Sequence, residues 1–482
     1  PTASDTIAKH TGSAEGAGTT MPTNKQTLKP TTKTGIWNSI GWATAGRGIN
    51  AVLSFLLMLL ASRALPAAEF GEYLIFLFAA GGFALLSQCG LGPVIARRAA
   101  ATRTGGKKAE TNAQRYKANQ LYSQALWLCL AAIALLTAAH QAGAGAWLQT
   151  RLVDGSSSEP LLASVWLPLF FGLQGLAILS GELLKADGQI NRYSQSLLIL
   201  APATALILAL GACLAGSANA AMFVAAGCVA YGCSALYAVA HLLSWQSLKP
   251  NLPLLKTLPT ECSPILGNAV FAFGCAQMDL FFVALFFSVE QVALYGFATR
   301  TVQFLLLPLH IAYGFATPFL ADLLQQRRDR LSQFCQQLSG ACLILSLASS
   351  VIIIAAYPWL FAGVNQGLEL TGLIVLGLLM AGQLVNAATS VSSVTLEIAG
   401  YGRIALTVNA LVVAASVAAF WSINSTAGLI GFALIAALMK VALNSGMALA
   451  NWRFLHIRVA ASRRGITEAV LLTHRRLMPR EC

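Results

Sequence analysis

The sequence predicts an all-α integral membrane protein with twelve transmembrane helices, arranged as two pseudo-symmetric six-helix lobes around a central cavity. Three observations lead to this prediction: the composition, the spacing of the apolar segments, and the distribution of Lys and Arg between them. Of the 482 residues, 56% are hydrophobic and 10% are charged, against about 25% charged in a typical soluble domain. This composition excludes a soluble globular protein and a disordered one.

Twelve apolar segments are long enough to cross the bilayer core, which is about 30 Å thick and needs about 20 apolar residues in a helix. In chain order they are 36–61, 70–95, 119–142, 161–186, 194–216, 219–243, 263–288, 292–320, 334–358, 368–396, 403–423 and 427–452. Helix 2 contains several glycines that allow bending or close packing. Helix 8 contains Pro308 and Pro318, which should weaken or kink it.

Lys and Arg are divided unevenly between the two sides of such a chain. Of the 31, 26 fall in the tails and even-numbered loops, two (Arg63 and Arg151) in odd-numbered loops, and three inside helices. Because cytoplasmic loops carry an excess of Lys and Arg, the split places both termini in the cytoplasm. It also supports the number twelve, since one missed helix would disturb the alternation. Topology thus explains the net charge of +13, and nucleic acid is not expected as a partner.

The expected organisation has five parts. They are a disordered cytoplasmic tail (1–34), an N-lobe of helices 1–6 (35–243), a cytoplasmic linker (244–262), a C-lobe of helices 7–12 (263–452) and a basic cytoplasmic tail (453–482). The first tail has no apolar segment typical of a cleaved signal peptide, and Met21 is an alternative start. All loops are too short to fold as a separate catalytic domain.

The two lobes show an internal repeat. SRALPAAEFGEYLIF (62–76) and FSVEQVALYGFATRT (287–301) each place a polar stretch before a Tyr that opens a helix. LLKADGQINRY (183–193) and EIAGYGRIALT (397–407) share a Gly-bearing helix exit. Because each half has an even number of helices, the halves enter the membrane in the same direction. This plan is common in transporters whose site lies between the repeats.

Three segments, SRALPAAEFGEY (62–73), LLSQCGLGPVIARRA (85–99) and MDLFFVALFFSVEQVALYGFATR (278–300), carry a family resemblance. With the exits around Gly188 and Gly402, they resemble the polysaccharide and O-antigen flippases of the multidrug/oligosaccharidyl-lipid/polysaccharide (MOP) exporter superfamily. The resemblance covers about 35–452. It implies transport of an undecaprenyl-pyrophosphate-linked oligosaccharide from the cytoplasmic to the periplasmic leaflet, through a cavity lined mainly by helices 1, 2, 7 and 8.

Four ionisable side chains lie deep in the predicted bilayer, where a charge costs about 2.5–3.5 kcal/mol on insertion scales. The first, Arg47, shares one face of helix 1 with Thr44, Asn50 and Ser54. One interpretation is a cavity-lining stripe that meets an anionic headgroup. The other is an arginine that packs helices together and is satisfied by backbone carbonyls of a neighbour.

Asp279 and Arg300 are the second and third. Asp279 shares a face of helix 7 with Asn268, and Arg300 shares a face of helix 8 with Gln303 and His310. Both lie about 14–15 Å from the outer loop at 1.5 Å per residue, so we expect an ion pair between them. A sharper hypothesis is that substrate phosphate opens this pair by displacing the carboxylate. His310 either packs against a neighbouring helix or carries protons.

Lys440 in helix 12 is the fourth, and it either lines the cavity or bridges helices. Three deep positive charges against one negative charge favour a substrate with phosphate or acidic groups, which arginine binds in pairs of hydrogen bonds. The substrate-binding candidates are therefore Thr44, Arg47, Asn50, Asn268, Asp279, Arg300, Gln303, His310 and Lys440.

The predicted function is a lipid-linked oligosaccharide flippase of the bacterial inner membrane, serving surface polysaccharide assembly such as O-antigen, lipopolysaccharide or exopolysaccharide. No catalytic residue, cofactor or metal is expected, since the cysteines lack metal spacing and no GxxxxGK[ST] loop is present. The expected partners are the polyprenyl-pyrophosphate-linked glycan and the bilayer, with other polysaccharide-assembly proteins left open. The alternatives are a small-molecule or drug antiporter of the same superfamily and a polytopic polysaccharide polymerase or ligase.

Overall fold

The computed structural model describes residues 33–103, 112–153, 160–242, 252–311, 320, 323–324, 328–364, 367–462 and 467. The chain divides into two units, Pro1–Asn38 and Ser39–Cys482. The first contributes only the start of helix α1 to the described residues. The expected N-terminal tail and most of the expected C-terminal tail therefore lie outside them. All that follows concerns the second unit.

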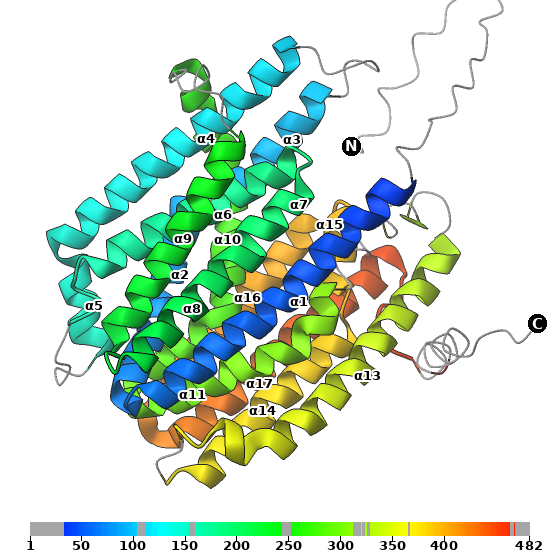
Figure 1. Ribbon diagram of the computed structural model, residues 1–482. Helices are drawn as coiled ribbons and strands as arrows, with labels where there is room; N and C mark the ends of the chain where they lie inside the picture. Colours follow the sequence, from blue (N-terminus) through cyan, green and yellow to red (C-terminus); the bar gives the residue numbers. More distant parts are fainter. Residues whose placement is uncertain are drawn as a thin grey trace, which may run out of the picture. The chain divides into compact units, whose positions relative to one another are not determined.

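The predicted fold class is confirmed. Within the described residues there is no strand, and twelve helical stretches are long and apolar enough to cross a membrane. These stretches are Thr44–Ala64, Ala67–Arg98, Asn119–Leu152, Trp166–Ala186, Ile190–Leu214, Ala220–Leu242, Thr257–Phe286, Val289–Ile311, Arg330–Leu360, Glu369–Ala388, Gly402–Ile423 and Gly428–Leu455. Figure 1 shows their helices running in roughly the same direction, as expected of a transmembrane bundle.

The first half of the chain supplies six spans, several of them built from more than one helical element. Its elements are α1 (Lys33–Ala64), α2 (Ala67–Ser87), α3 (Leu91–Arg103), α4 (Asn112–Ala139), η1 (His140–Ala144), α5 (Gly145–Leu152), α6 (Trp166–Ala186), α7 (Ile190–Tyr193), η2 (Ser194–Leu200), α8 (Ala201–Leu214) and α9 (Ala220–Leu242). The break between α2 and α3 falls at Cys89 and Gly90, which both have positive φ. Gly90 packs there against the backbone of α10 so closely that a Cβ would lie 2.9 Å from the Leu266 nitrogen.

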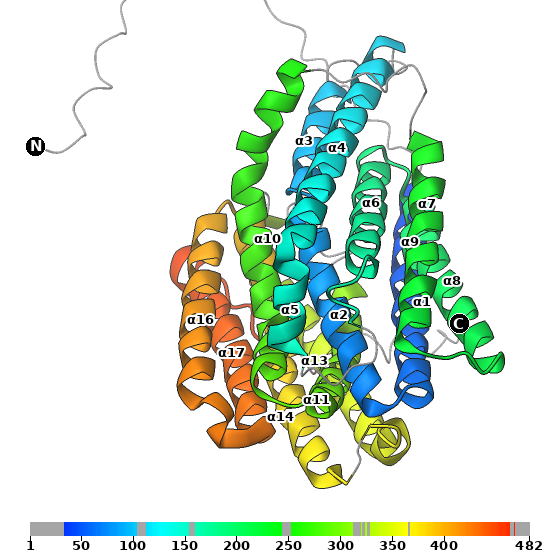
Figure 2. The same cartoon turned by 90° about the vertical axis from the view of Figure 1, so that its left-hand side faces the viewer.

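The second half supplies the other six spans. Its elements are α10 (Leu252–Phe286), α11 (Val289–Val302), η4 (Gln303–Leu306), α13 (Arg328–Leu360), α14 (Glu369–Ala388), α15 (Ser392–Ile398), α16 (Gly402–Ile423), η5 (Asn424–Ala427), α17 (Gly428–Ala450) and η6 (Asn451–Leu455). The two halves separate in Figure 2, where α16 and α17 lie to the left and α8 and α9 to the right.

Two segments expected outside the membrane helices are helical. The third span kinks at Gly143, whose φ of 119° is not helical, and continues as α5, so 145–152 belong to a helix instead of a loop. In the expected linker, 252–262 form the first turns of α10. Pro259 and Pro264 lie inside this helix. Isolated prolines are tolerated in membrane helices because neighbouring groups satisfy the freed carbonyls.

The eighth span changes its helical form at the position that Pro308 predicts. Regular α-helix ends at Val302, and Gln303–Leu306 form a 3₁₀ turn before the helix resumes. Pro308 has no N–H to donate to the carbonyl four residues earlier, and its ring crowds that carbonyl. The tighter turn immediately precedes this position.

The lobes meet through α2 and α11. Phe70 stacks edge-on against Phe297 with ring centroids 6.1 Å apart, and glycines allow the backbones to approach closely on both sides of this contact. A Cβ on Gly296 would lie 2.7 Å from Leu74 Cδ1. A Cβ on Gly71 would overlap the Val289 carbonyl oxygen. Small residues at such positions are what close helix packing in membranes requires.

Gly71→Ala should therefore destabilise the lobe contact. Because the extra methyl would meet backbone, which cannot move as a side-chain end can, we expect a cost of about 1–3 kcal/mol. Thermal unfolding of the purified protein in detergent would measure it. Gly81→Ala on the same helix is the matched control, since its nearest neighbour would lie 3.8 Å away. Equal melting temperatures for both variants would contradict the close approach.

Candidate cavity between the lobes

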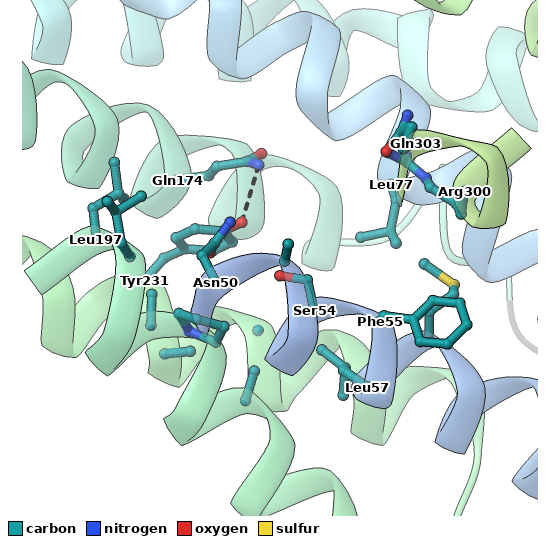
Figure 3. A pocket seen from close by; sticks show the side chains of 18 of the residues that line it. Asn50, Ser54, Phe55, Leu57, Leu77, Gln174, Leu197, Tyr231, Arg300 and Gln303 are labelled. Carbon is teal, nitrogen blue, oxygen red and sulfur yellow. Dashed lines mark hydrogen bonds between the residues drawn. The ribbon is translucent and has the colours of Figure 1, made fainter. Parts of the chain in front are cut away.

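A cavity of about 530 Å³ lies midway along the spans, between α1, α2, α6, η2, α8 and α9 of the first half and the α11–η4 stretch of the second. Figure 3 shows Arg300 and Gln303 together at one end of this view, with Gln174 and Tyr231 towards the other. Asn50 and Ser54 of α1 also line the cavity. The lining thus comes mostly from the first lobe and is completed by the second.

Arg300 is the one Asp, Glu, Lys or Arg among the described residues that line this cavity. Within the described part of the chain, no acidic oxygen lies within 4 Å of its guanidinium. The phenols of Tyr73 and Tyr231 are within electrostatic range of its charge, and both also line the cavity. The cavity therefore contains one cation, Arg300, whose hydrogen-bond donors are free to bind an anion.

Neutral polar groups line the remainder. Gln174 Nε2 donates to the Tyr231 hydroxyl over 3.3 Å, the bond dashed in Figure 3. The other amide atom, Gln174 Oε1, is buried and has no hydrogen-bond partner in the described structure. Because leaving a buried acceptor unpaired costs about 1–3 kcal/mol, a ligand hydroxyl that donated to this oxygen would be favoured.

Local structure explains why the eighth span turns three polar side chains to the cavity. Arg300, Gln303 and His310 all line it: Arg300 precedes the 3₁₀ turn, Gln303 is its first residue and His310 follows it. On α1, Asn50 and Ser54 are four residues apart and so share a face. Four of the predicted substrate-binding residues thus line one cavity: Asn50, Arg300, Gln303 and His310.

Arg47 takes a different position from Asn50, outside the lining of this cavity. Its Nη1 donates to the His310 carbonyl oxygen over 2.7 Å, which ties α1 of the first lobe to the far end of the eighth span. Thr44 on α1 and Asn268 on α10 are half-buried and also lie outside this lining. Their roles in substrate binding stay predictions.

The ion pair expected between Asp279 and Arg300 is not formed. Asp279 is only 3% exposed, and its Oδ2 accepts a hydrogen bond from the Tyr295 hydroxyl over 3.1 Å. Lys440 and Arg300 are both within electrostatic range of Asp279, and among the described residues neither forms an ion pair with it. Lys440 instead donates to the Cys275 carbonyl, one turn before Asp279. Residue counting places Asp279 and Arg300 at one depth, but depth along a helix does not fix the direction of a side chain around it.

Three polar residues of the cavity lining, Tyr73, Gln174 and Tyr231, were not predicted from the sequence. Ionisable groups stand out in a sequence of this kind because they cost most in the bilayer, whereas these three side chains are neutral. Gln174 gave a signal of its own, since it is an amide in the middle of an apolar span. Tyrosines give little signal, because they also occur at helix ends and in packed interiors.

A second polar contact joins the lobes where α3 meets α10. Arg98 Nη2 lies 2.5 Å from Glu261 Oε1, Arg98 Nε donates to Glu261 Oε2 over 3.3 Å, and Arg97 Nη2 is 3.4 Å from Glu261 Oε2. This two-pronged geometry is the stronger form of a charge-assisted hydrogen bond. Cys262, next in the chain, is 2% exposed.

Glu261→Arg should loosen this contact, because it places three cations together. We expect maleimide labelling of Cys262 to rise several-fold and to return to the wild-type level when Arg98→Glu is added. Peptide mass spectrometry would quantify the label, with a cysteine-free peptide of the protein as loading reference. Unchanged Cys262 labelling in Glu261→Arg would show that the ion pair does not hold the lobes together.

Comparison with known proteins gives similarity in structure alone. No protein-family model matches the sequence, and no curated protein sequence matches it either. Among solved structures, an inward-facing multidrug resistance MATE family transporter of the MOP superfamily matches with a TM-score of 0.66 and 14% identity, over 88% of this chain and 96% of that one.

Two further structures have the same fold. The lipid II flippase MurJ in an inward closed conformation matches with a TM-score of 0.64 and 12% identity, over 91% of this chain and 94% of that one. A MOP superfamily transporter from Pyrococcus furiosus, described as having a binding pocket of reverse polarity, matches with a TM-score of 0.53 and 13% identity, over 86% and 95%. The chain therefore has the twelve-helix, two-lobed fold of the MOP superfamily transporters.

Proposed function

We propose that this protein is a flippase that moves an undecaprenyl-pyrophosphate-linked oligosaccharide from the cytoplasmic to the periplasmic leaflet of the bacterial inner membrane. The observation that carries the proposal is Arg300, a cation without an acidic partner in the described structure, which lines a cavity midway through the membrane spans. A pyrophosphate would supply the missing negative charge.

The energetics of the pyrophosphate support this assignment. Taking an anion out of water costs several kcal/mol unless it is paired and hydrogen-bonded. The planar guanidinium of Arg300 can meet two phosphate oxygens at once. Gln174, Tyr231 and Asn50 would then bind sugar hydroxyls at the other end of the cavity, while the polyprenyl chain stays in lipid.

Transport would follow from rocking of the lobes about this cavity. The contacts that must change are those between α2 and α11, the Arg98–Glu261 ion pair and the Arg47–His310 hydrogen bond. With both termini in the cytoplasm, as the distribution of Lys and Arg indicates, the Arg98–Glu261 contact lies on the cytoplasmic side. Its opening would admit substrate from that side.

Complementation tests the proposal. Expression in a strain deleted for its own polysaccharide flippase should restore surface glycan, detected by gel and by glycan-specific antibody. A variant with Gly71→Val, which blocks the lobe contact described above, serves as an inactive control. No restoration across a panel of flippase-deleted strains, with the protein present in the membrane, would reject glycan export.

Export of a small molecule is the second candidate, and the cavity size favours it. A volume of about 530 Å³ lies within the range of about 300–1,000 Å³ typical of sites for drug-sized ligands. The lone Arg300 then predicts anionic instead of cationic compounds. Accumulation assays with matched anionic and cationic dyes would separate the two candidates: dye efflux without glycan restoration would favour this one.

A further inference from the structure

The chain after α17 forms a fixed strap at one end of the second lobe. His456 has a left-handed conformation with φ 57°, which ends η6. Residues 456–462, the C-terminal strap, then run across the bundle without regular structure. Ser339 Oγ donates to the Val459 carbonyl over 2.9 Å, and the Ala461 N–H donates to the Ala388 carbonyl over 2.8 Å. The strap is therefore anchored to both α13 and α14.

Two further bonds fix the outer part of the strap. Ser332 Oγ donates to the Arg458 carbonyl over 3.1 Å, and Ser462 Oγ donates to Gln336 Oε1 over 2.7 Å. Ser332 and Gln336 are both on α13. These bonds hold the backbone on either side of Arg458, so the position of its Cα is set by the fold.

Side chains alternate along the strap, as in any extended segment. Ile457 and Val459 are 3% and 1% exposed and join an apolar cluster with Leu331 and Cys335. Arg458 lies between them and is exposed. Burial of its two neighbours thus forces the guanidinium outward.

Arg458 faces a cavity of about 610 Å³ between α13 and the end of α17. The cavity is lined by Gln336, Ala448, Trp452, Arg458 and strap residues 459–462. Within the described residues, no acidic oxygen lies within 4 Å of the Arg458 guanidinium. Trp452 is 54% exposed, so an indole and an unpaired guanidinium share one open cavity.

The level of this cavity in the membrane indicates its ligand. The last span ends at Leu455, three residues before Arg458. That is the level of the lipid headgroups, where tryptophan rings and arginine side chains are favoured. Lys and Arg are also in excess on this side of the chain, as expected for a surface that faces anionic lipids.

We propose that this cavity binds the headgroup of an anionic phospholipid. The Arg458 guanidinium donates to the lipid phosphate, and the Trp452 indole packs against the glycerol and upper acyl region. This site is separate from the transport cavity and does not depend on the transported substrate.

Native mass spectrometry of the full-length protein in detergent would test the site, with phosphatidylglycerol and phosphatidylcholine titrated as competing lipids. We expect Arg458→Gln to weaken phosphatidylglycerol binding about fivefold, since a basic residue near the surface contributes about 1 kcal/mol. Phosphatidylcholine binding should be unchanged. Arg453→Gln is the matched control, because Arg453 is exposed at a similar level but outside the cavity lining.

Each outcome decides the proposal. Equal losses in Arg458→Gln and Arg453→Gln would overturn a specific site in favour of diffuse attraction to the surface, and no loss in either would overturn it outright. Displacement of the lipid by equimolar glycerol phosphate would overturn the assignment to a lipid, because it would show a phosphate site that does not need the acyl chains. Thermal unfolding of both variants should match wild type, because neither side chain is buried.

Discussion

Arg300→Gln is expected to reduce transport at least tenfold while leaving the protein folded and in the membrane. The guanidinium is the one fixed positive charge of the cavity lining in the described residues. Each charge-assisted hydrogen bond to an anion is worth about 1.5–3 kcal/mol, and 1.4 kcal/mol corresponds to a factor of ten. The measurement is the rate of surface glycan appearance in the complemented strain, normalised to the amount of protein in the membrane.

Three control variants separate charge from shape. Arg300→Lys keeps the charge but loses the planar pair of donors, so its activity should lie between those of wild type and Arg300→Gln. Gln303→Leu removes a neutral neighbour on the same stretch and should cost less. Arg47→Gln breaks only the bond to the His310 carbonyl and should be milder as well. A fully active Arg300→Gln would remove the observation on which the proposed substrate rests.

The arrangement of the spans could be predicted from the sequence because the bilayer imposes it. Chain segments must bury about 20 apolar residues and satisfy every backbone group internally, so apolar segments and the Lys and Arg distribution are enough to place twelve helices. The Pro308 break could be predicted for the same kind of reason, since it follows from the missing N–H of one residue.

The cavity could be predicted only in part. Arg300, Gln303 and His310 lie together because a local rule, the spacing along one helix, places them together. The partner of Asp279 depends on how α10 is rotated against α11 and α17, and that rotation is set by packing of many apolar side chains. Tyr295 therefore donates to the carboxylate, while Lys440 and Arg300 are both within electrostatic range without an ion pair.

The absence of the expected Asp279–Arg300 ion pair affects how substrate could bind. Asp279 is within electrostatic range of Arg300 but forms no ion pair with it, so substrate phosphate need not break an ion pair to reach the guanidinium. The hypothesis that phosphate opens an Asp279–Arg300 ion pair is therefore replaced by the hypothesis that phosphate binds an Arg300 guanidinium that is not in an ion pair. We expect Asp279 and Lys440 to act in the stability of the second lobe, because neither lines the transport cavity.

Lys440→Met is expected to destabilise the protein by about 2–3 kcal/mol. The change removes the bond from Lys440 Nζ to the Cys275 carbonyl and the positive charge within electrostatic range of the Asp279 carboxylate, which is 3% exposed. An uncompensated buried polar or charged group costs about 1–3 kcal/mol or more. Thermal unfolding in detergent, with denaturant unfolding in mixed micelles, would measure the change.

The double variant Asp279→Asn with Lys440→Met should recover much of that loss, because both charges are removed together. Residues that interact within one network typically show coupling energies of about 0.5–3 kcal/mol in such a cycle. Since neither side chain lines the transport cavity, the double variant should also retain transport, unlike Arg300→Gln. Additive stability changes would mean that the two charges do not interact. A double variant that is stable but does not transport would contradict a purely structural role and would show that Asp279 and Lys440 act in the transport cycle.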